Sequence, residues 1–501
     1  MAPEPVRRPV ERVDLCVLGP GAGGRLVAAR AAEAGASVLH VSPAGGEANA
    51  SGSAPPRPDF MAPLAFIEAA SLFHANRVIA GLGLAQASEA APGSAPPLPS
   101  GEGLVRHMRR AAAMLSPRLT DARLKALRVR MSVDAARFED AKTLRVGERN
   151  VVARRFVLAP ERQWAIPAIP GLAEIDYLTP DRPLVASRPA GRLAVIGFTD
   201  ASLALAQAHR RLGSEVILLG FSTDERERAA AVFGEEALRL ILMALIGEGV
   251  AVRSDLAVSR VEARGREARV HAVGPSGAET VDVGQVLVAP GTRAIFADPG
   301  WQEARIGLHD GAPLLDARLR TSNGRIVAIG ADIGGDLFSA TLERQADMIV
   351  DQALYGRRAG VTPTFRFVPT SPQVAVVGLT EETARREGEV RIVRTSFAWH
   401  PAHVARYRGS APVAGEIKVI ARPDGRILGC TIVGDGADDL AGMWALAVAR
   451  RLKLADVAQP AFPDIGRHGL TRRATRLEIF GWPRAGGLLL RLSRWWRMLG
   501  G

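Results

Sequence analysis

The chain has 501 residues, of which 47% are hydrophobic and 23% charged, as in an ordinary globular protein of several domains. Its formal net charge of +12 comes almost wholly from scattered arginines that are not interleaved with stacking aromatics, so we expect solvated basic faces and no nucleic-acid partner. The two cysteines, Cys16 and Cys430, fall in apolar runs, which argues against a disulfide scaffold, and we predict no metal site.

A glycine-rich turn near the N-terminus sets the interpretation of the chain. The apolar run Val13–Leu18 has the length of a strand, and it leads into a G-x-G-x-x-G pattern, an alanine-rich helix and a second apolar run, Val38–Val41. The glycines are Gly19, Gly21 and Gly24. This order predicts a Rossmann βαβ unit with a dinucleotide pyrophosphate at the start of the helix. The alternative is a glycine turn without a ligand.

Ser42 stands at the end of the second strand, where a dinucleotide-binding unit normally has a carboxylate. A hydroxyl can accept one hydrogen bond from the ribose but cannot make the charged bidentate contact. We therefore expect weaker dinucleotide binding at this unit.

Further along the chain, helices are expected at 60–80 and 103–115, and short strands between 127 and 159. Arg192–Phe221 repeats the strand–turn–helix–strand pattern, which predicts a second nucleotide-type domain. Two later apolar strands, Val286–Ala289 and Ile326–Gly330, are expected to return to the first domain. After Gly360, strand-like runs followed by the helical stretch Leu440–Leu452 predict an appended α+β module.

This order of segments resembles the flavoprotein disulfide reductases, among them dihydrolipoamide dehydrogenase, glutathione reductase and mercuric reductase. The resemblance is carried by Ile166–Leu172, Arg192–Gly213, Leu319–Asn323 and Ser371–Glu381. It implies an α/β fold with two Rossmann-like dinucleotide-binding domains, for FAD and for a degenerate NAD(P) site, and a C-terminal α+β dimerisation domain that makes a homodimer. The expected boundaries are 1–185 and 286–358 for the FAD domain, 186–285 for the NAD(P)-like domain, 359–475 for dimerisation and 476–501 for an amphipathic tail.

The resemblance also implies the residues that bind the flavin. They would be Gly19, Gly21, Gly24, Ser42, Gly46, Gly330 and Asp332. Two departures weaken this set, because Glu161 replaces a glycine near the cofactor and Asp332 lies one residue out of register with the Gly-Asp of the family.

The catalytic positions of the family depart further. Ala48 and Ser53 hold the places of its redox cysteines, and Phe462 and Arg467 those of its proton-relay pair, so we predict no catalytic residue of the known type. In the second fingerprint, Gly197–Ser202, only the first glycine remains, with Thr199 where the pyrophosphate would approach and the negative charge of Asp200 beside it. The resemblance places the family's glutamate near the nicotinamide at Ala204 and its ribose-binding position at Gly220. We therefore do not expect NAD(P)H in the usual site.

Two hypotheses follow from these departures, and whether the chain is an enzyme stays open between them. The first is a divergent FAD-dependent oxidoreductase without the dithiol, which exchanges electrons with an unknown partner and is not a disulfide, lipoamide or mercuric reductase. The second is a catalytically inactive homologue that acts as a binding or scaffolding subunit. One form of this hypothesis places the subunit at a membrane.

The C-terminal tail has helical amphipathic character. Over Leu488–Leu499, Leu and Trp side chains share one face while Arg side chains lie mostly on the other, which is typical of a helix on an anionic membrane surface. The alternative is docking on the protein itself or on its dimer mate. Because Met1–Arg12 lacks the apolar core of a secretory signal, we expect a cytoplasmic protein, peripheral at the inner membrane face if the tail binds lipid.

Overall fold

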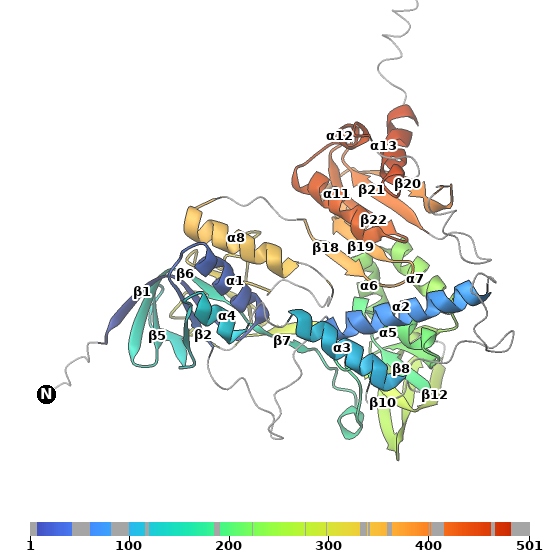
Figure 1. Cartoon of the computed structure of the whole chain (residues 1–501), viewed down its shortest axis with the longest axis horizontal. Helices are drawn as coiled ribbons and strands as arrows, with labels where there is room; N and C mark the ends of the chain where they lie inside the picture. Colours follow the sequence, from blue (N-terminus) through green and yellow to red (C-terminus); the bar gives the residue numbers. More distant parts are fainter. Residues whose placement is uncertain are drawn as a thin grey trace, which may run out of the picture. The chain divides into compact units, whose positions relative to one another are not determined.

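The computed structural model describes residues 8–42, 61–81, 100–115, 120–184, 191–222, 224–275, 277–296, 298–330, 338, 341–357, 363–399, 401, 415–461 and 466–481. The chain divides into two compact units (Figure 1). The N-terminal unit comprises Met1–Val232 and Ile241–Thr370, and the C-terminal unit comprises Phe233–Leu240 and Ser371–Gly501.

The first sheet of the N-terminal unit contains the strand that leads into the glycine turn. Its order is β3-β2-β1-β6-β5-β4, with β17 also beside β6. Strands β1, β2, β3, β6 and β17 are parallel, whereas β4 and β5 form an antiparallel edge. The bounds are β1 (Val10–Leu18), β2 (Val38–Val41), β3 (Arg130–Ser132), β4 (Ala136–Phe138), β5 (Thr143–Val146), β6 (Arg149–Leu158) and β17 (Ile326–Ala328).

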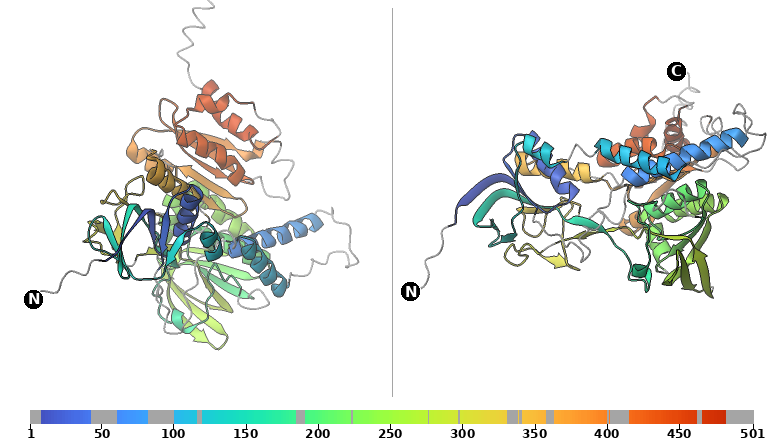
Figure 2. Two further views of the ribbon diagram at one scale, coloured as in Figure 1. Left: turned by 60° about the vertical axis from the view of Figure 1, so that its left-hand side comes forward. Right: turned by 60° about the horizontal axis from the view of Figure 1, so that its bottom comes forward.

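Both faces of this sheet are covered. Alternate side chains of β1 face opposite ways, so Leu15 and Val17 pack under the helices while Cys16 joins Phe138 and Phe156 in the other core layer. The covering helices are α1 (Ala22–Glu33), α4 (Asp121–Ala126) and α8 (Thr341–Tyr355). Helices α1 and α8 lie side by side (Figure 2). The glycine turn is therefore held at the carboxyl edge of a sheet with a core on each side.

The second sheet has the order β12-β11-β10-β9-β8-β13 and contains the repeated βαβ unit. The parallel part is β8 (Arg192–Ile196), β9 (Glu215–Gly220), the start of β10 (Ala251–Arg264) and β13 (Gln285–Val288), and the antiparallel part adds β11 (Glu267–Gly274) and β12 (Gly277–Val283). The nearby helices are α2 (Met61–Gly81), α3 (Gly101–Leu115), α5 (Asp200–Arg211), α6 (Glu225–Phe233) and α7 (Glu235–Gly247). Helix α2 packs against α3 and α5, which buries most of α5.

The expectation that Val286–Ala289 returns to the first domain is wrong. The strand β13 pairs in parallel with β8, residue Val286 opposite Ala194, and completes the second sheet. Only β17 joins the first sheet, beside β6. An apolar run buried on both faces fits either parallel sheet equally well, so its composition could not decide between them.

Short elements link the two sheets. They are β7 (Glu161–Trp164) paired with β14 (Thr292–Ile295), β15 (Leu308–His309) paired with β16 (Ala312–Pro313), and the 3₁₀ turn η2 (Leu172–Glu174). The β7–β14 ribbon follows directly after β6 and so begins beside the glycine turn. Strand β18 (Phe365–Val368) closes the N-terminal unit in the sequence.

The C-terminal unit is an antiparallel sheet with helices. Its strands lie in the order β19-β22-β21-β20, and α11 packs on β19 and β22 with Trp444 fully buried. The bounds are β19 (Val374–Gly378), α9 (Glu381–Glu387), β20 (Arg391–Ser396), η3 (Phe397–Trp399), β21 (Glu416–Ala421), β22 (Ile427–Val433), α11 (Ala437–Ala449), α12 (Leu454–Ala458) and α13 (Gly469–Gly481). Inside this unit the buried Lys418 binds Glu236 at 2.7 Å and Glu381 at 3.2 Å.

None of the helices in the described ranges combines the length and the apolarity needed to cross a bilayer. The predicted amphipathic stretch Leu488–Leu499 lies outside the described residues. Its membrane contact therefore stays a prediction.

Candidate functional site

The glycine turn between β1 and α1 lies tightly against the end of β6. A Cβ added at Gly19, whose φ is +114°, would lie 2.1 Å from the Ala159 carbonyl oxygen, and one at Gly24 would lie 2.5 Å from Cβ of Ala159. At Gly21 it would lie 2.3 Å from the carbonyl oxygen of Pro160. All three positions therefore require glycine, because any side chain would push the turn away from β6.

The start of α1 is open to an anion. Gly21 is the N-cap and has no side chain to cap the helix, and the first turn of the twelve-residue helix has no acidic residue. The N–H of Gly24 donates to the carbonyl oxygen of Gly21, but the N–H groups of Ala22 and Gly23 have no carbonyl partner within the helix. They border a cavity of about 170 Å³. Its wall includes Ala22, Gly23, Arg25, Arg162 and Gly330. Helix N–H groups together with arginines suit a pyrophosphate.

Arg162, on β7, organises the far side of this cavity. Its Nε donates to Oγ1 of Thr292 at 2.9 Å, and its NH1 group donates to the carbonyl oxygen of Gly330 at 3.1 Å. The N–H of Gly330 donates to Oε1 of Gln345 at 2.8 Å. The N–H of Gly330 is thus used within the protein, and its carbonyl oxygen, which already accepts from Arg162, keeps one lone pair for a further donor.

A second, larger cavity of about 530 Å³ adjoins the first, since Pro20, Ala159, Pro160 and Glu161 line both. Its other walls include Val41, Ala136, Phe296 and Trp301. The rings of Phe296 and Trp301 meet edge to face with 6.0 Å between their centres. A largely apolar cavity of this size accommodates a nucleoside. The two cavities together fit an extended dinucleotide whose pyrophosphate lies at the glycine turn.

His40 fixes the same turn from β2. It is fully buried, and its Nε2 lies 3.0 Å from the carbonyl oxygen of Gly19. Burial lowers the pKa of His40, so the neutral ring donates to that oxygen. Ser42, two residues on, donates its backbone N–H to the carbonyl oxygen of Ser132 at 2.9 Å, which places it at the end of β2 as predicted from the pattern.

The corresponding turn of the second βαβ unit is closed by its own side chains. Thr199 and Ser202 form a reciprocal cap, in which Oγ of Ser202 accepts from the N–H of Thr199 at 2.7 Å and Oγ1 of Thr199 accepts from the N–H of Ser202 at 3.2 Å. The fully buried Asp200 accepts from the N–H groups of Ala201, at 2.8 Å, and Phe338, at 2.9 Å.

Glu225, the first residue of α6, completes this closure. Its carboxylate accepts from the N–H of Phe198 and from that of Phe221, each at 2.9 Å, and only 5% of the residue is exposed. A Cβ added at Gly220, the ribose-binding position by resemblance, would lie 3.2 Å from Oε2 of Glu225. Burial raises the pKa of Glu225. An internal carboxylate thus lies at the carboxyl ends of β8 and β9, where a nucleotide binds in this fold.

Several predicted site residues cannot be compared with the structure. Gly46, Asp332, Ala48, Ser53 and Phe462 lie outside the described residues. In the C-terminal unit Arg467, at the position of the acidic half of the proton relay, binds Asp435 at 2.6 Å. Gly21 and Gly330 line the smaller cavity and Gly19 lines the larger one, whereas Gly24 lines neither and packs against Ala159. Their roles in binding stay predictions.

Sequence reasoning missed His40, Arg162 and Glu225. Arg162 was two residues from Pro160 in a segment already compared with the flavin loop of the family, so its position was a usable signal. A glutamate at the start of a helix normally faces solvent and favours the helix dipole. Because its partners are backbone N–H groups just after β8 and β9, which carry no side-chain signal, nothing in the sequence distinguished Glu225.

Residues 13–346 match the family described as pyridine nucleotide-disulphide oxidoreductase, and residues 364–464 match the dimerisation domain of that family. This chain belongs to the pyridine nucleotide-disulphide oxidoreductase family. The predicted membership is confirmed. The family is flavin-dependent, and the C-terminal module is its dimerisation domain.

Mercuric reductases are among the relatives. Those of Staphylococcus aureus and Lysinibacillus sphaericus are 29% and 31% identical over 334 and 336 residues, which is 66% of this chain in each case. The matches span 59% and 60% of the length of those relatives. The solved structure of the HOCl-induced flavoprotein disulfide reductase RclA from Escherichia coli gives a TM-score of 0.70 at 19% identity and covers 92% of this chain and 99% of that one. The predicted fold is therefore confirmed.

The functional hypotheses drawn from the sequence are wrong. They excluded disulfide and mercuric reduction, or made the chain an inactive scaffold, because individual side chains of the family are replaced. The relatives are mercuric reductases, and the structural neighbour is a flavoprotein disulfide reductase. The family to which the chain belongs is one of oxidoreductases, and none of these matches supports an inactive scaffold. The hypotheses gave too much weight to replaced side chains. They gave too little to the fold of the family, which the chain keeps.

Proposed function

We propose that this protein is an FAD-dependent oxidoreductase of the disulfide-reductase class, which delivers two electrons to a disulfide or to a thiophilic metal ion. The observation that carries the proposal is the pair of adjoining cavities at the glycine turn, with its N-terminal helix end, Arg162 and an apolar nucleoside pocket. Family membership supports the flavin and the reaction class.

The residues of the chain would hold FAD in named ways. The N-terminus of α1 would attract the pyrophosphate, and Arg25, whose charge is balanced by Asp121, would add a hydrogen-bond donor. Phe296 and Trp301 would exclude water from the adenosine end. His40 keeps the turn in place by its bond to Gly19. The flavin, when bound, supplies the capacity to accept two electrons from a donor and return them to an acceptor.

The thiols of the chain do not suit an electron relay. Cys16 lies in β1 and Cys430 in β22, both fully buried, and burial raises the pKa of each thiol. A relay needs an accessible thiolate. We therefore propose that the acceptor meets the flavin directly, so that oxidation of the reduced flavin breaks the disulfide bond of the acceptor and releases two thiols.

We propose further that NAD(P)H is a poor electron donor while Glu225 keeps its present contacts. The support is that the carboxylate uses the N–H groups of Phe198 and Phe221 and lies against Gly220. A nucleotide entering there would have to displace a buried, doubly bonded carboxylate and would meet its negative charge. The donor would then be a partner protein or another reductant.

The acceptor proposal is tested with the flavin-loaded protein under anaerobic conditions. The flavin is photoreduced and mixed with an aromatic disulfide that releases a coloured thiolate or, separately, with thiol-buffered Hg(II), and flavin reoxidation is followed by absorbance. We expect reoxidation by at least one acceptor, at the same rate in the Cys16→Ala/Cys430→Ala double variant. Failure of both acceptors would reject the reaction class. Loss of the reaction in the double variant at unchanged flavin content would reject direct transfer.

We propose that the protein is a homodimer through its C-terminal unit and that Leu488–Leu499 contacts an anionic membrane surface. The dimerisation-domain match supports the first statement, and the amphipathic sequence supports the second. Light scattering gives the mass in solution, with twice the chain mass expected. Flotation with anionic vesicles, with and without residues 488–501, tests the tail, and equal flotation of both forms would remove the membrane contact.

A further inference from the structure

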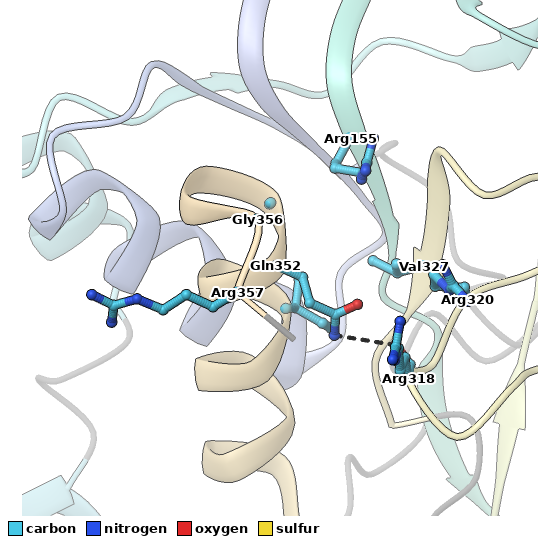
Figure 3. Close-up of a pocket in the computed structure, with 9 residues that line it drawn as sticks. Arg155, Arg318, Arg320, Val327, Gln352, Gly356 and Arg357 are labelled. Atoms are coloured by element: carbon cyan, nitrogen blue, oxygen red, sulfur yellow. Dashed lines mark hydrogen bonds between the residues drawn. The ribbon is translucent and has the colours of Figure 1, made fainter. Parts of the chain in front are cut away.

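A separate cavity of about 180 Å³ lies against β6, β17 and the C-terminal half of α8. Its wall includes Arg155, Arg318, Arg320, Val327, Gln352 and Ala353. None of these residues lines the two cavities at the glycine turn. Figure 3 shows Gln352 extending from α8 towards Arg318, to whose carbonyl oxygen its Nε2 donates at 3.5 Å.

The positive charge at this cavity exceeds the negative charge around it. Arg320 is neutralised by Asp316, whose Oδ2 lies 2.7 Å from its NH2 group. No carboxylate within the described ranges forms an ion pair with Arg155 or Arg318, and the NH1 group of Arg155 donates instead to the carbonyl oxygen of Arg154 at 3.0 Å. Two guanidinium groups at one cavity are thus left without a counter-charge in the described structure.

Arg357 belongs to the wall but not to this group. Its side chain extends away from Arg155 and Arg318 in Figure 3. It lies 3.8 Å from Asp351 and over the ring of Tyr355 at 5.1 Å from the ring centre. The cationic part of the cavity is therefore formed by Arg155, Arg318 and Arg320.

The surroundings strengthen the attraction for an anion. Val327, Ile349 and Ala353, which form the apolar wall, are all buried, so little water screens the guanidinium groups from that side. Burial, and after it the positive charge of Arg325, lowers the pKa of the Arg155 guanidinium. An anion would offset both unfavourable effects at once.

We propose that this cavity is a binding site for a phosphoryl group. Two unpaired guanidinium groups balance the two charges of a phosphate, and their planar N–H pairs match its oxygens in bidentate geometry. The third arginine, held by Asp316, can donate without adding net charge. The volume suits a phosphoryl group with a small substituent and is about a third of the nucleoside cavity. The phosphoryl group belongs either to a soluble phosphate compound or to a lipid headgroup.

The test uses full-length protein saturated with FAD, so that the anion site at the glycine turn is filled. Inorganic phosphate is titrated calorimetrically into wild-type protein, the Arg155→Gln/Arg318→Gln variant and the matched control Arg109→Gln/Arg110→Gln, whose arginines lie on α3 and outside this cavity. We expect equal binding to wild type and control, and binding weaker by about tenfold or more in the cavity variant. The single variant Arg318→Gln, in a surface loop, gives the same comparison if the double variant does not fold.

A vesicle arm distinguishes the two sources of the phosphoryl group. Flotation with phosphatidic acid vesicles is compared with phosphatidylcholine vesicles for the same three full-length proteins, so that any contribution of the tail is equal in all three. Binding of free phosphate assigns a soluble ligand, and binding of phosphatidic acid alone assigns a lipid headgroup. In either case the cavity variant must lose the binding that the wild type shows. Binding by neither probe, or equal binding by the wild type and the cavity variant, would overturn the proposal.

Discussion

The two βαβ units of the N-terminal unit share a topology and differ in what satisfies their turns. At Gly19–Gly24 the turn lies against the backbone of Ala159 and Pro160 and opens into two cavities. At Gly197–Ser202 the N–H groups are taken by Glu225, Asp200 and a Thr–Ser cap. The fold alone therefore does not make a nucleotide site, since the same turn can be open to a ligand or satisfied from within.

The largest effect is expected from filling the open turn. In Gly24→Val the added Cβ would lie 2.5 Å from Cβ of Ala159, and the methyl groups of the valine would overlap that residue. Overpacking costs about 1–3 kcal/mol and moves α1 away from β6, so FAD content should fall by about tenfold or more. Flavin released by heat and quantified by absorbance measures it.

The matched control for this variant is Gly442→Ala in α11, where an added Cβ meets nothing within 4 Å. It should keep full flavin content. A Gly24→Val protein that folds and retains its flavin would show that the close packing of the first turn is not required for binding.

The second largest effect is expected from opening the closed turn. Glu225→Ala removes the carboxylate that accepts from Phe198 and Phe221. It should cost about 1–3 kcal/mol of unfolding free energy, because two buried N–H groups lose their partner. Anaerobic flavin reduction by NADH or NADPH should become about tenfold faster, since those groups are then available to a nucleotide.

Glu225→Gln serves as the control, because the amide fills the same space and keeps one acceptor oxygen. Its rate should lie much closer to that of the wild type. If NADPH reduced the wild-type flavin rapidly and the rate did not rise in Glu225→Ala, the Glu225 carboxylate would not be what closes the second turn.

A smaller effect is expected from completing the first unit. Ser42→Asp supplies the ribose carboxylate that the end of β2 lacks. A charge-assisted bond contributes about 1.5–3 kcal/mol, and we expect FAD to bind about tenfold tighter or more. Titration of flavin-free protein by tryptophan fluorescence quenching measures the Kd. Ser42→Asn, which adds no charge, should change the Kd little. An equal increase in affinity in Ser42→Asp and Ser42→Asn would assign the effect to packing and not to charge.

The smallest effect is a pH dependence of stability. The pKa of Glu225 is raised above its ordinary value of 4.5 by burial, so the folded protein binds the proton more tightly than the unfolded chain does. The resulting stabilisation is present below about pH 4.5 and is lost as the pH rises through the folded-state pKa. The unfolding free energy of wild type minus that of Glu225→Gln should therefore decrease with pH over this window and then stay constant. Urea unfolding at a series of pH values checks the sign, and an increase with pH would contradict it.

The sequence predicted the first unit well because its signals are local. An apolar run, the glycine spacing and the following helix fix β1, the turn and α1 without knowledge of distant contacts. The placement of Val286–Val288 failed because a doubly buried strand carries no mark of the sheet it joins. Glu225 was missed because its partners are backbone N–H groups that no side-chain pattern reveals.

The functional class failed for a different reason. The replacements at Ala48, Ser53 and Phe462 are certain from the sequence, but they describe which side chains are missing and not what the remaining framework binds. The cavities at the glycine turn depend on Arg162, His40 and the β7–β14 ribbon. Those contacts join residues more than a hundred positions apart in two of the three cases, which residue spacing cannot predict.

The most direct test of the flavoprotein assignment is the visible absorption spectrum of the purified protein, with the heat-released flavin identified and quantified. We expect a flavin spectrum and close to one FAD per chain, either as purified or after incubation with added FAD. A colourless protein that takes up no added FAD, while its far-ultraviolet circular dichroism shows an intact fold, would contradict it.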